Sequence, residues 1–139
     1  LETAYGEHAA WVDEYLVTIQ SFLAPQDPHW TTPPLQDADQ AKLDAFASFL
    51  DQSLAELTTR QARADRVRAL SLDLLAHHAV LLGHVVAAHA ARLAGNQEKA
   101  AAEFDRAAQF LQDTEPQYSS YIDTMLALRV IHRAKAQGE

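Results

Sequence analysis

Cysteine is absent from the 139 residues, and lysine, glycine and proline are scarce. Without cysteine the chain has no thiol nucleophile, no Cys-ligated zinc and no iron–sulfur cluster. Only three lysines and a formal net charge of −8 argue against nonspecific binding to nucleic acid and against docking on anionic membranes. The missing residues therefore exclude thiol and thiolate–metal chemistry, and the charge balance disfavours polyanionic partners.

Alanine and leucine dominate what is present, with 27 and 18 residues. Apolar residues make up 48% of the chain, which excludes a disordered or collagen-like polypeptide. The chain is long enough to bury a core without disulfides or a structural metal, and we expect residues 1–139 to form a single domain. Because a helical pattern is already running at its start, we expect this domain to be a module cut from a longer protein.

Apolar residues recur with the helical period in the first third of the chain, and no strand-like alternation competes with it. The first helix is predicted from the stripe Tyr5, Ala9, Val12, Leu16, Ile19 and Leu23, which Trp11, Tyr15 and Phe22 widen into a broad buried face. Pro25 and Pro28 end this helix, because proline lacks the N–H that a helix interior needs. Four prolines within 24–35 predict a non-helical connector.

The second helix has a readable start at Asp37, an N-cap residue with Gln40 three positions on. Its apolar stripe is Leu43, Phe46, Leu50, Leu54 and Leu57. We expect the helix to end at about Arg60. The following segment, 60–66, is polar and has neither glycine nor proline, so a tight turn and a continuous helix both fit it.

The third helix, about residues 64–94, is the most unusual, because residues 74–91 carry no charge when histidine is neutral. A membrane span needs about 20 strongly apolar residues, whereas here 18 are diluted by four histidines, a glycine and several alanines. Apolar side chains cover nearly the whole circumference, which is typical of a helix surrounded by other helices. We therefore expect a central bundle helix and no membrane span.

The remainder of the chain predicts two more helices. Gly95–Asn96 ends the central helix and caps a helix with the stripe Ala101, Phe104, Ala108 and Leu111, which stops before Pro116. A last helix has Ile122, Met125, Leu126, Leu128 and Ile131 as its apolar residues. The sequence thus predicts an all-α, antiparallel bundle of four to five helices around the central apolar helix.

The four histidines between positions 77 and 89 are the first candidates for chemistry. His77 and His84 share a helix face but lie about 10 Å apart along its axis, too far for one metal ion to bind both. Neither HExxH nor the Glu-x-x-His of di-iron bundles is present. We expect these histidines to hydrogen-bond to neighbouring helices, and we predict no metal and no cofactor.

The chain shows no pattern typical of an enzyme. The acidic residues are spread over polar helix faces, and the sequence has no nucleophile elbow and no glycine-rich phosphate loop. We therefore predict no catalytic residue within these 139 positions. Side chains suited to a binding surface are aromatic, guanidinium or imidazole groups, and the candidates are Trp11, Tyr15, Trp30, Arg63, Arg66, His77 and His84.

Three segments resemble the helical module that follows the catalytic barrel in bacterial family-20-like glycoside hydrolases of the cell surface: RADRVRALSLDLLAHHAVLL, RLAGNQEKAAAEFDRAAQFLQDTEP and YSSYIDTMLALRV. The likeness covers about residues 40–135 and rests on Arg66–Val67, Gly95–Asn96, Glu115 and Asp123. It implies a noncatalytic accessory module of an extracytoplasmic, carbohydrate-active protein whose catalytic acids lie elsewhere. Its partner would be a neighbouring domain of the parent chain or another protein.

Two alternatives to the accessory module stay open. The first is a stand-alone bundle, cytoplasmic or not, that binds a small ligand with Trp11, Tyr15, His77 and His84. The second is a protein adapter of the tetratricopeptide type, suggested by the helical hairpin of residues 88–111, although the pattern does not recur about 34 residues away.

Overall fold

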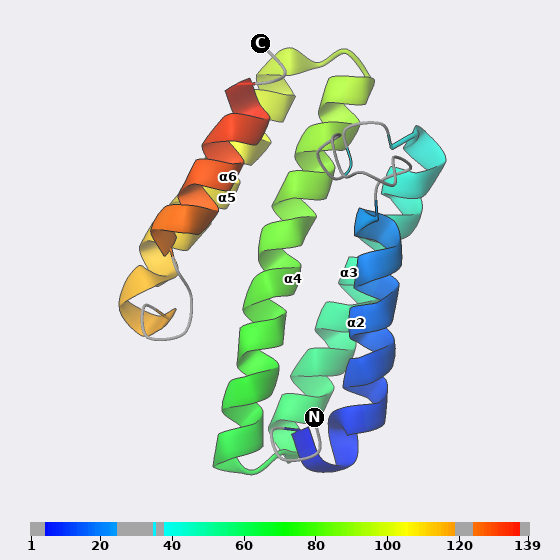
Figure 1. The fold of residues 1–139 in the computed structure, drawn as a ribbon, viewed down its shortest axis with the longest axis vertical. Helices are drawn as coiled ribbons and strands as arrows, with labels where there is room; N and C mark the ends of the chain where they lie inside the picture. The colour runs from blue at the N-terminus through cyan, green and yellow to red at the C-terminus, as the bar shows by residue number, and fades with distance from the viewer. Residues whose placement is uncertain (1–4, 25–34, 36–37, 119–123, 137–139) are drawn as a thin grey trace. The chain divides into compact units, whose positions relative to one another are not determined.

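The computed structural model describes residues 5–24, 35, 38–118 and 124–136, and every regular element within these ranges is helical (Figure 1). The helices pack antiparallel, α2 against α3, α3 against α4 and α4 against α5. The predicted all-α bundle is therefore confirmed. The elements in chain order are the 3₁₀ turn η1 (Gly6–His8), α2 (Ala9–Leu23), α3 (Gln40–Arg63), α4 (Arg66–Leu93), α5 (Gln97–Tyr118) and α6 (Thr124–Ala136).

The chain divides into two compact units, Leu1–Val80 and Leu81–Glu139. The first unit contains η1, α2, α3 and the beginning of α4, and the second contains the end of α4 with α5 and α6. The central helix contributes to both. That residues 1–139 act as one domain stays a prediction.

The face that α2 buries differs from the predicted stripe. Val12, Tyr15 and Ile19 are buried, whereas Leu16 is half exposed. Spacings of three and four residues put Val12, Tyr15 and Ile19 in one line along the helix, while Leu16 lies a further 100° or so round its axis. The expected burial of Tyr15 is therefore confirmed, whereas the expected burial of Leu16 is wrong.

The start of α3 is set by Asp39 and not by the predicted Asp37, which lies outside the described residues. An Asp39 carboxylate oxygen accepts a hydrogen bond from the backbone N–H of Lys42 at 2.8 Å, which satisfies one of the unpaired donors of the first turn. Gln40 does not complete a capping box, because its side-chain amide donates to Asp44 at 2.7 Å.

The segment between α3 and α4 is a tight turn, which settles the alternative that the sequence left open. Ala64 has extended backbone angles, φ −83° and ψ 153°, that interrupt the helix. Asp65 then accepts a hydrogen bond from the backbone N–H of Arg68 at 2.9 Å, as an N-cap residue does. A cap and one extended residue thus reverse the chain without glycine or proline.

The bounds of α4 agree with the predicted central helix to within two residues. Among the described residues, α4 is the one helix long and apolar enough to cross a membrane, with a mean hydropathy of 1.5 over 18 residues, of which 28% are buried. Length and composition alone give that result, and core helices of soluble proteins share it. The absence of a span therefore stays a prediction.

The turn from α4 to α5 forms as the sequence predicts. Gly95 has φ +81°, a left-handed conformation that suits a residue without Cβ, and its N–H donates to the carbonyl of Arg92. Asn96 then accepts from the backbone N–H of Lys99 at 3.0 Å and caps α5. The predicted stop before Pro116 is wrong, because α5 continues to Tyr118. The proline lacks an N–H to donate, but it lies two residues from the end of α5, where Tyr118 is buried.

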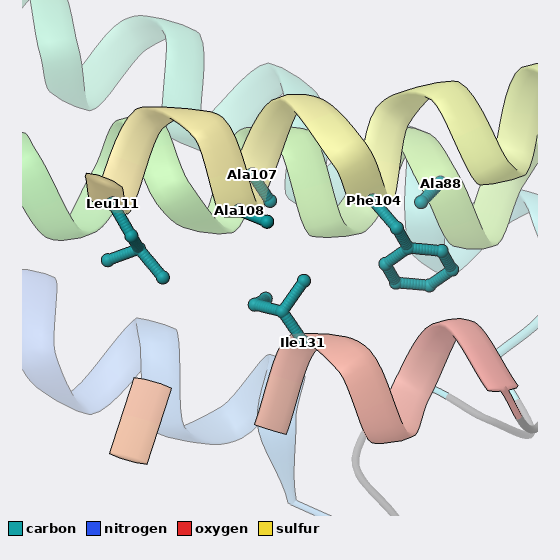
Figure 2. Close-up of a cluster of buried hydrophobic side chains, with 6 residues drawn as sticks. All are labelled: Ala88, Phe104, Ala107, Ala108, Leu111 and Ile131. Atoms are coloured by element: carbon teal, nitrogen blue, oxygen red, sulfur yellow. The ribbon is translucent and has the colours of Figure 1, made fainter. Parts of the chain in front are cut away.

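The core of the second unit is built on α5 and is shown in Figure 2. Ile131 projects from α6 toward α5, between the buried side chains of Phe104 and Leu111 (Figure 2). The alanines at 107 and 108 leave room for this close approach. Leu128 also packs on this cluster, whereas the predicted contributions of Ile122, Met125 and Leu126 fall outside the described side chains.

Candidate functional site

A surface groove of about 460 Å³ lies between α2 and α3 in the first unit. Each helix supplies one row of residues spaced by a turn, so the groove follows the line where the two helices meet. Its volume falls within the usual range of small-molecule sites. The lining is Trp11, Glu14, Tyr15 and Thr18 from α2, and Phe49, Gln52, Ser53 and Glu56 from α3.

The aromatic side chains of the groove belong to a continuous series of stacked rings. Ring centroids are 5.5 Å apart between Trp11 and Tyr15, and 5.8 Å apart between Tyr15 and Phe49. Phe22 extends the series into the core, because its ring lies 5.8 Å from that of Phe49 in a tilted arrangement and 4.5 Å from that of Phe46. Such offset stacking fixes ring orientation and stabilises the structure beyond simple burial, so the wall of the groove is preformed.

Arg60 holds one end of the groove in place through three contacts. Its guanidinium carbon lies 5.0 Å from the centroid of Trp11, a cation–π geometry. Its Nε donates to Glu56 at 2.8 Å, and its Nη1 lies 3.0 Å from Nδ1 of His8. Because arginine can only donate, Nδ1 of the buried His8 is the acceptor and carries no proton.

Tyr15 is the most buried lining residue, with 2% of its surface exposed. Burial raises the pKa of its phenol to about 12, because the anion would lose its hydration. The hydroxyl oxygen is buried without a hydrogen-bond partner among the described residues. Tyr15 therefore stays neutral and serves as an aromatic wall, not as a base.

A second surface of the first unit lies at the turn from α3 to α4, where arginine and aliphatic side chains are both exposed. Val67 is 67% exposed and Leu70 is 41% exposed, and one helical turn separates them. Arg63 is the last residue of α3 and Arg66 the first of α4. Both are exposed, and neither forms an ion pair with another described residue. We call these four residues the turn face.

The histidines are dispersed and do not form one site. His77 is buried, and burial lowers its pKa and that of His78. His84, in the second unit, has Nδ1 3.4 Å from a carboxylate oxygen of Glu103, which also pairs with Arg106. Burial, followed by the charge of Arg92, lowers the pKa of His89 to about 4. No group of three or more potential metal ligands occurs in the part of the chain that the structure describes.

A hollow of about 410 Å³ in the second unit is less suited to a ligand. Its two basic groups already have protein partners, since Arg92 donates to the carbonyl of Ala134 at 2.8 Å and Lys135 to Asp105 at 2.7 Å. Binding an anion there would require breaking these contacts. The groove of the first unit has no such competition at Glu14, which forms no ion pair among the described residues.

The predicted binding residues thus do not form a single site. Trp11 and Tyr15 line the groove, and Arg63 and Arg66 belong to the turn face. His77 and His84 join neither surface, and Trp30 lies outside the described residues. No family model, no curated protein and no solved structure matches this chain.

Sequence reasoning missed the contacts of Arg60 and six of the eight groove residues: Glu14, Thr18, Phe49, Gln52, Ser53 and Glu56. The carboxylates were interpreted as part of polar helix faces. A usable signal was present, because Phe49, Gln52 and Glu56 follow one another at helical spacing on α3. That spacing predicts a groove only when α2 is known to pack beside these residues of α3.

Proposed function

We propose that the chain is a noncatalytic helical interaction module that binds a neighbouring domain or a protein partner through the turn face. The observation that carries this proposal is the exposure of Val67 and Leu70 next to two arginines without ion-pair partners. Exposed apolar groups rimmed by polar residues are typical of protein-binding surfaces. Arginine is also enriched in such interfaces.

The turn face also defines the chemistry of a suitable partner. Val67 and Leu70 need an apolar surface that removes them from water. Arg63 and Arg66 favour carboxylates placed to either side, which they can bind in a bidentate way. An apolar patch with acidic residues at its rim supplies both.

The resemblance stated above supports a finer form of this proposal, an accessory module of an extracytoplasmic, carbohydrate-active protein. Arg66 and Val67, on which the resemblance partly rests, belong to the turn face. In this form the partner is the catalytic domain of the same protein, and the module stabilises and orients it.

The test is a binding measurement with the neighbouring domain of the parent protein, supplied as a separate polypeptide. We expect the double variant Val67→Asp/Leu70→Asp to bind at least about 100-fold more weakly, because each side chain loses 1.5 kcal/mol or more of burial. Titration calorimetry gives the affinity, and circular dichroism checks that the helices persist. Val17→Asp is the matched control, since Val17 is 60% exposed on α2 and lies outside the turn face. Equal loss in both variants, or in neither, would contradict the proposal.

A separate expectation concerns catalysis. The isolated chain should fold and yet hydrolyse neither chitobiose-type nor aryl-glycoside substrates, because the proposal places the catalytic acids in another domain. Release of a chromogenic aglycone is the measurement. Hydrolysis that copurifies with the folded chain and disappears on its thermal unfolding would overturn the noncatalytic assignment.

The groove between α2 and α3 favours a second candidate function, the binding of a small ligand. It unites Trp11 and Tyr15 as that alternative requires, but without His77 and His84. The adapter of the tetratricopeptide type has one supporting feature, the hairpin of α4 and α5, and stays an alternative.

A further inference from the structure

The groove has an uneven distribution of charge and apolar surface. Its lining includes two carboxylates and no basic residue. Arg60 lies beside the groove and balances Glu56 at 2.8 Å. The carboxylate of Glu14 has no such partner among the described residues, so one negative charge of the groove remains uncompensated.

The same wall already holds one organic cation, the guanidinium group of Arg60. This cation lies over the indole of Trp11 while Glu56 binds its edge. An aromatic face and a carboxylate together are thus sufficient to place a cation here. The groove offers the same two components again in the half-buried ring of Phe49 and the carboxylate of Glu14, whereas the ring of Tyr15 is covered by its neighbours.

From these observations we infer that the groove between α2 and α3 is a binding site for a small alkylated ammonium ion. The cation lies against the aromatic wall near Glu14, and its alkyl groups contact the rings. The hydroxyls of Thr18 and Ser53 and the amide of Gln52 accept or donate hydrogen bonds to a polar substituent of the ligand. This site is separate from the turn face and does not depend on a protein partner.

The choice of a cation over a neutral polar ligand follows from the geometry of the rings. The stacked rings cover much of one another's faces, and Arg60 covers another part of Trp11. A flat neutral ring therefore finds little open aromatic face for stacking. A compact ammonium ion needs only the exposed part of one ring, that of Phe49, and gains from the charge of Glu14.

The test titrates the 139-residue chain with choline and with its neutral isostere 3,3-dimethylbutan-1-ol. The two probes have the same shape, so any difference in affinity reports the charge. We expect choline to bind about tenfold more tightly, with saturable changes in the NMR signals of the Trp11 indole N–H and the Phe49 amide. Equal affinities, or no saturable change with choline, would overturn the inference.

Two variants locate the site. Glu14→Gln should weaken choline binding about fivefold while leaving the neutral isostere unchanged. Asp13→Asn is its matched control, because Asp13 is the preceding exposed acid on α2 and does not line the groove. An equal effect of both variants would mean that choline responds only to net charge, and the assignment to the groove would be withdrawn.

Discussion

Replacing Phe104 by alanine is expected to lower the free energy of unfolding by about 3–5 kcal/mol. Phe104 is 1% exposed and lies in the apolar cluster of the second unit, together with Leu111 and Ile131. Its ring also meets His89 edge-on at 5.6 Å and supports the guanidinium of Arg92 at 5.0 Å. Alanine would leave a cavity beneath both groups. Urea unfolding followed by circular dichroism measures the loss.

Phe110 provides the matched control on the same helix. It is only partly buried, and it is not part of the apolar cluster around Phe104. Phe110→Ala should therefore cost about 1 kcal/mol, because less apolar surface is lost. If the two variants are equally unstable, the cluster shown in Figure 2 is not the stabilising core of the second unit.

Acid is expected to destabilise the protein before its carboxylates are protonated, through His89. The pKa of this imidazole is about 4 in the folded state against an ordinary value of 6.5, first because of burial and second because of the positive charge of Arg92. At a pH between these two values, the imidazole of His89 is protonated in the unfolded chain but neutral in the folded chain. The free energy of unfolding is therefore highest above about pH 6.5 and decreases as the pH is lowered, by about 3 kcal/mol at pH 4.

The variant His89→Leu isolates this contribution. Leucine keeps an apolar side chain against Phe104 and has no titrating group, so its unfolding free energy should change much less between pH 6.5 and pH 4. A smaller slope of the same sign should remain, because the pKa values of His77 and His78 are also lowered by burial. Chemical unfolding at a series of pH values tests this. Parallel curves for the two proteins would show that His89 is not the responsible group.

The helices could be predicted because their signals are local. The turn at Gly95 and the Asn96 cap need only a left-handed residue and a side-chain acceptor at fixed positions, and both formed as expected. The errors occurred where a choice depended on tertiary contacts. Tyr15 and Leu16 are adjacent and both were expected on the buried face of α2, but only Tyr15, which stacks on Phe49 of α3, is buried. Pro116 lies in the last turn of α5, two residues before the buried Tyr118, and such a tertiary neighbour is not visible in the local pattern.

The candidate sites were harder to predict than the helices. Aromatic and arginine residues could be identified as candidates from their chemistry, but their grouping could not. Arg60 and His8 are 52 positions apart and are joined by a hydrogen bond. Glu14 acquires significance only from the residues of α3 that face it. Spacing within one helix carries no information about such neighbours.

The contacts of Arg60 have a consequence for how this sequence can vary during evolution. One planar group simultaneously meets a ring face, a carboxylate and a neutral imidazole, a combination for which lysine has neither the shape nor the number of donors. Loss of the arginine would leave Glu56 without its partner and Nδ1 of His8 without its donor. His8, Trp11, Glu56 and Arg60 are therefore expected to be inherited together, and relatives should change them as a set.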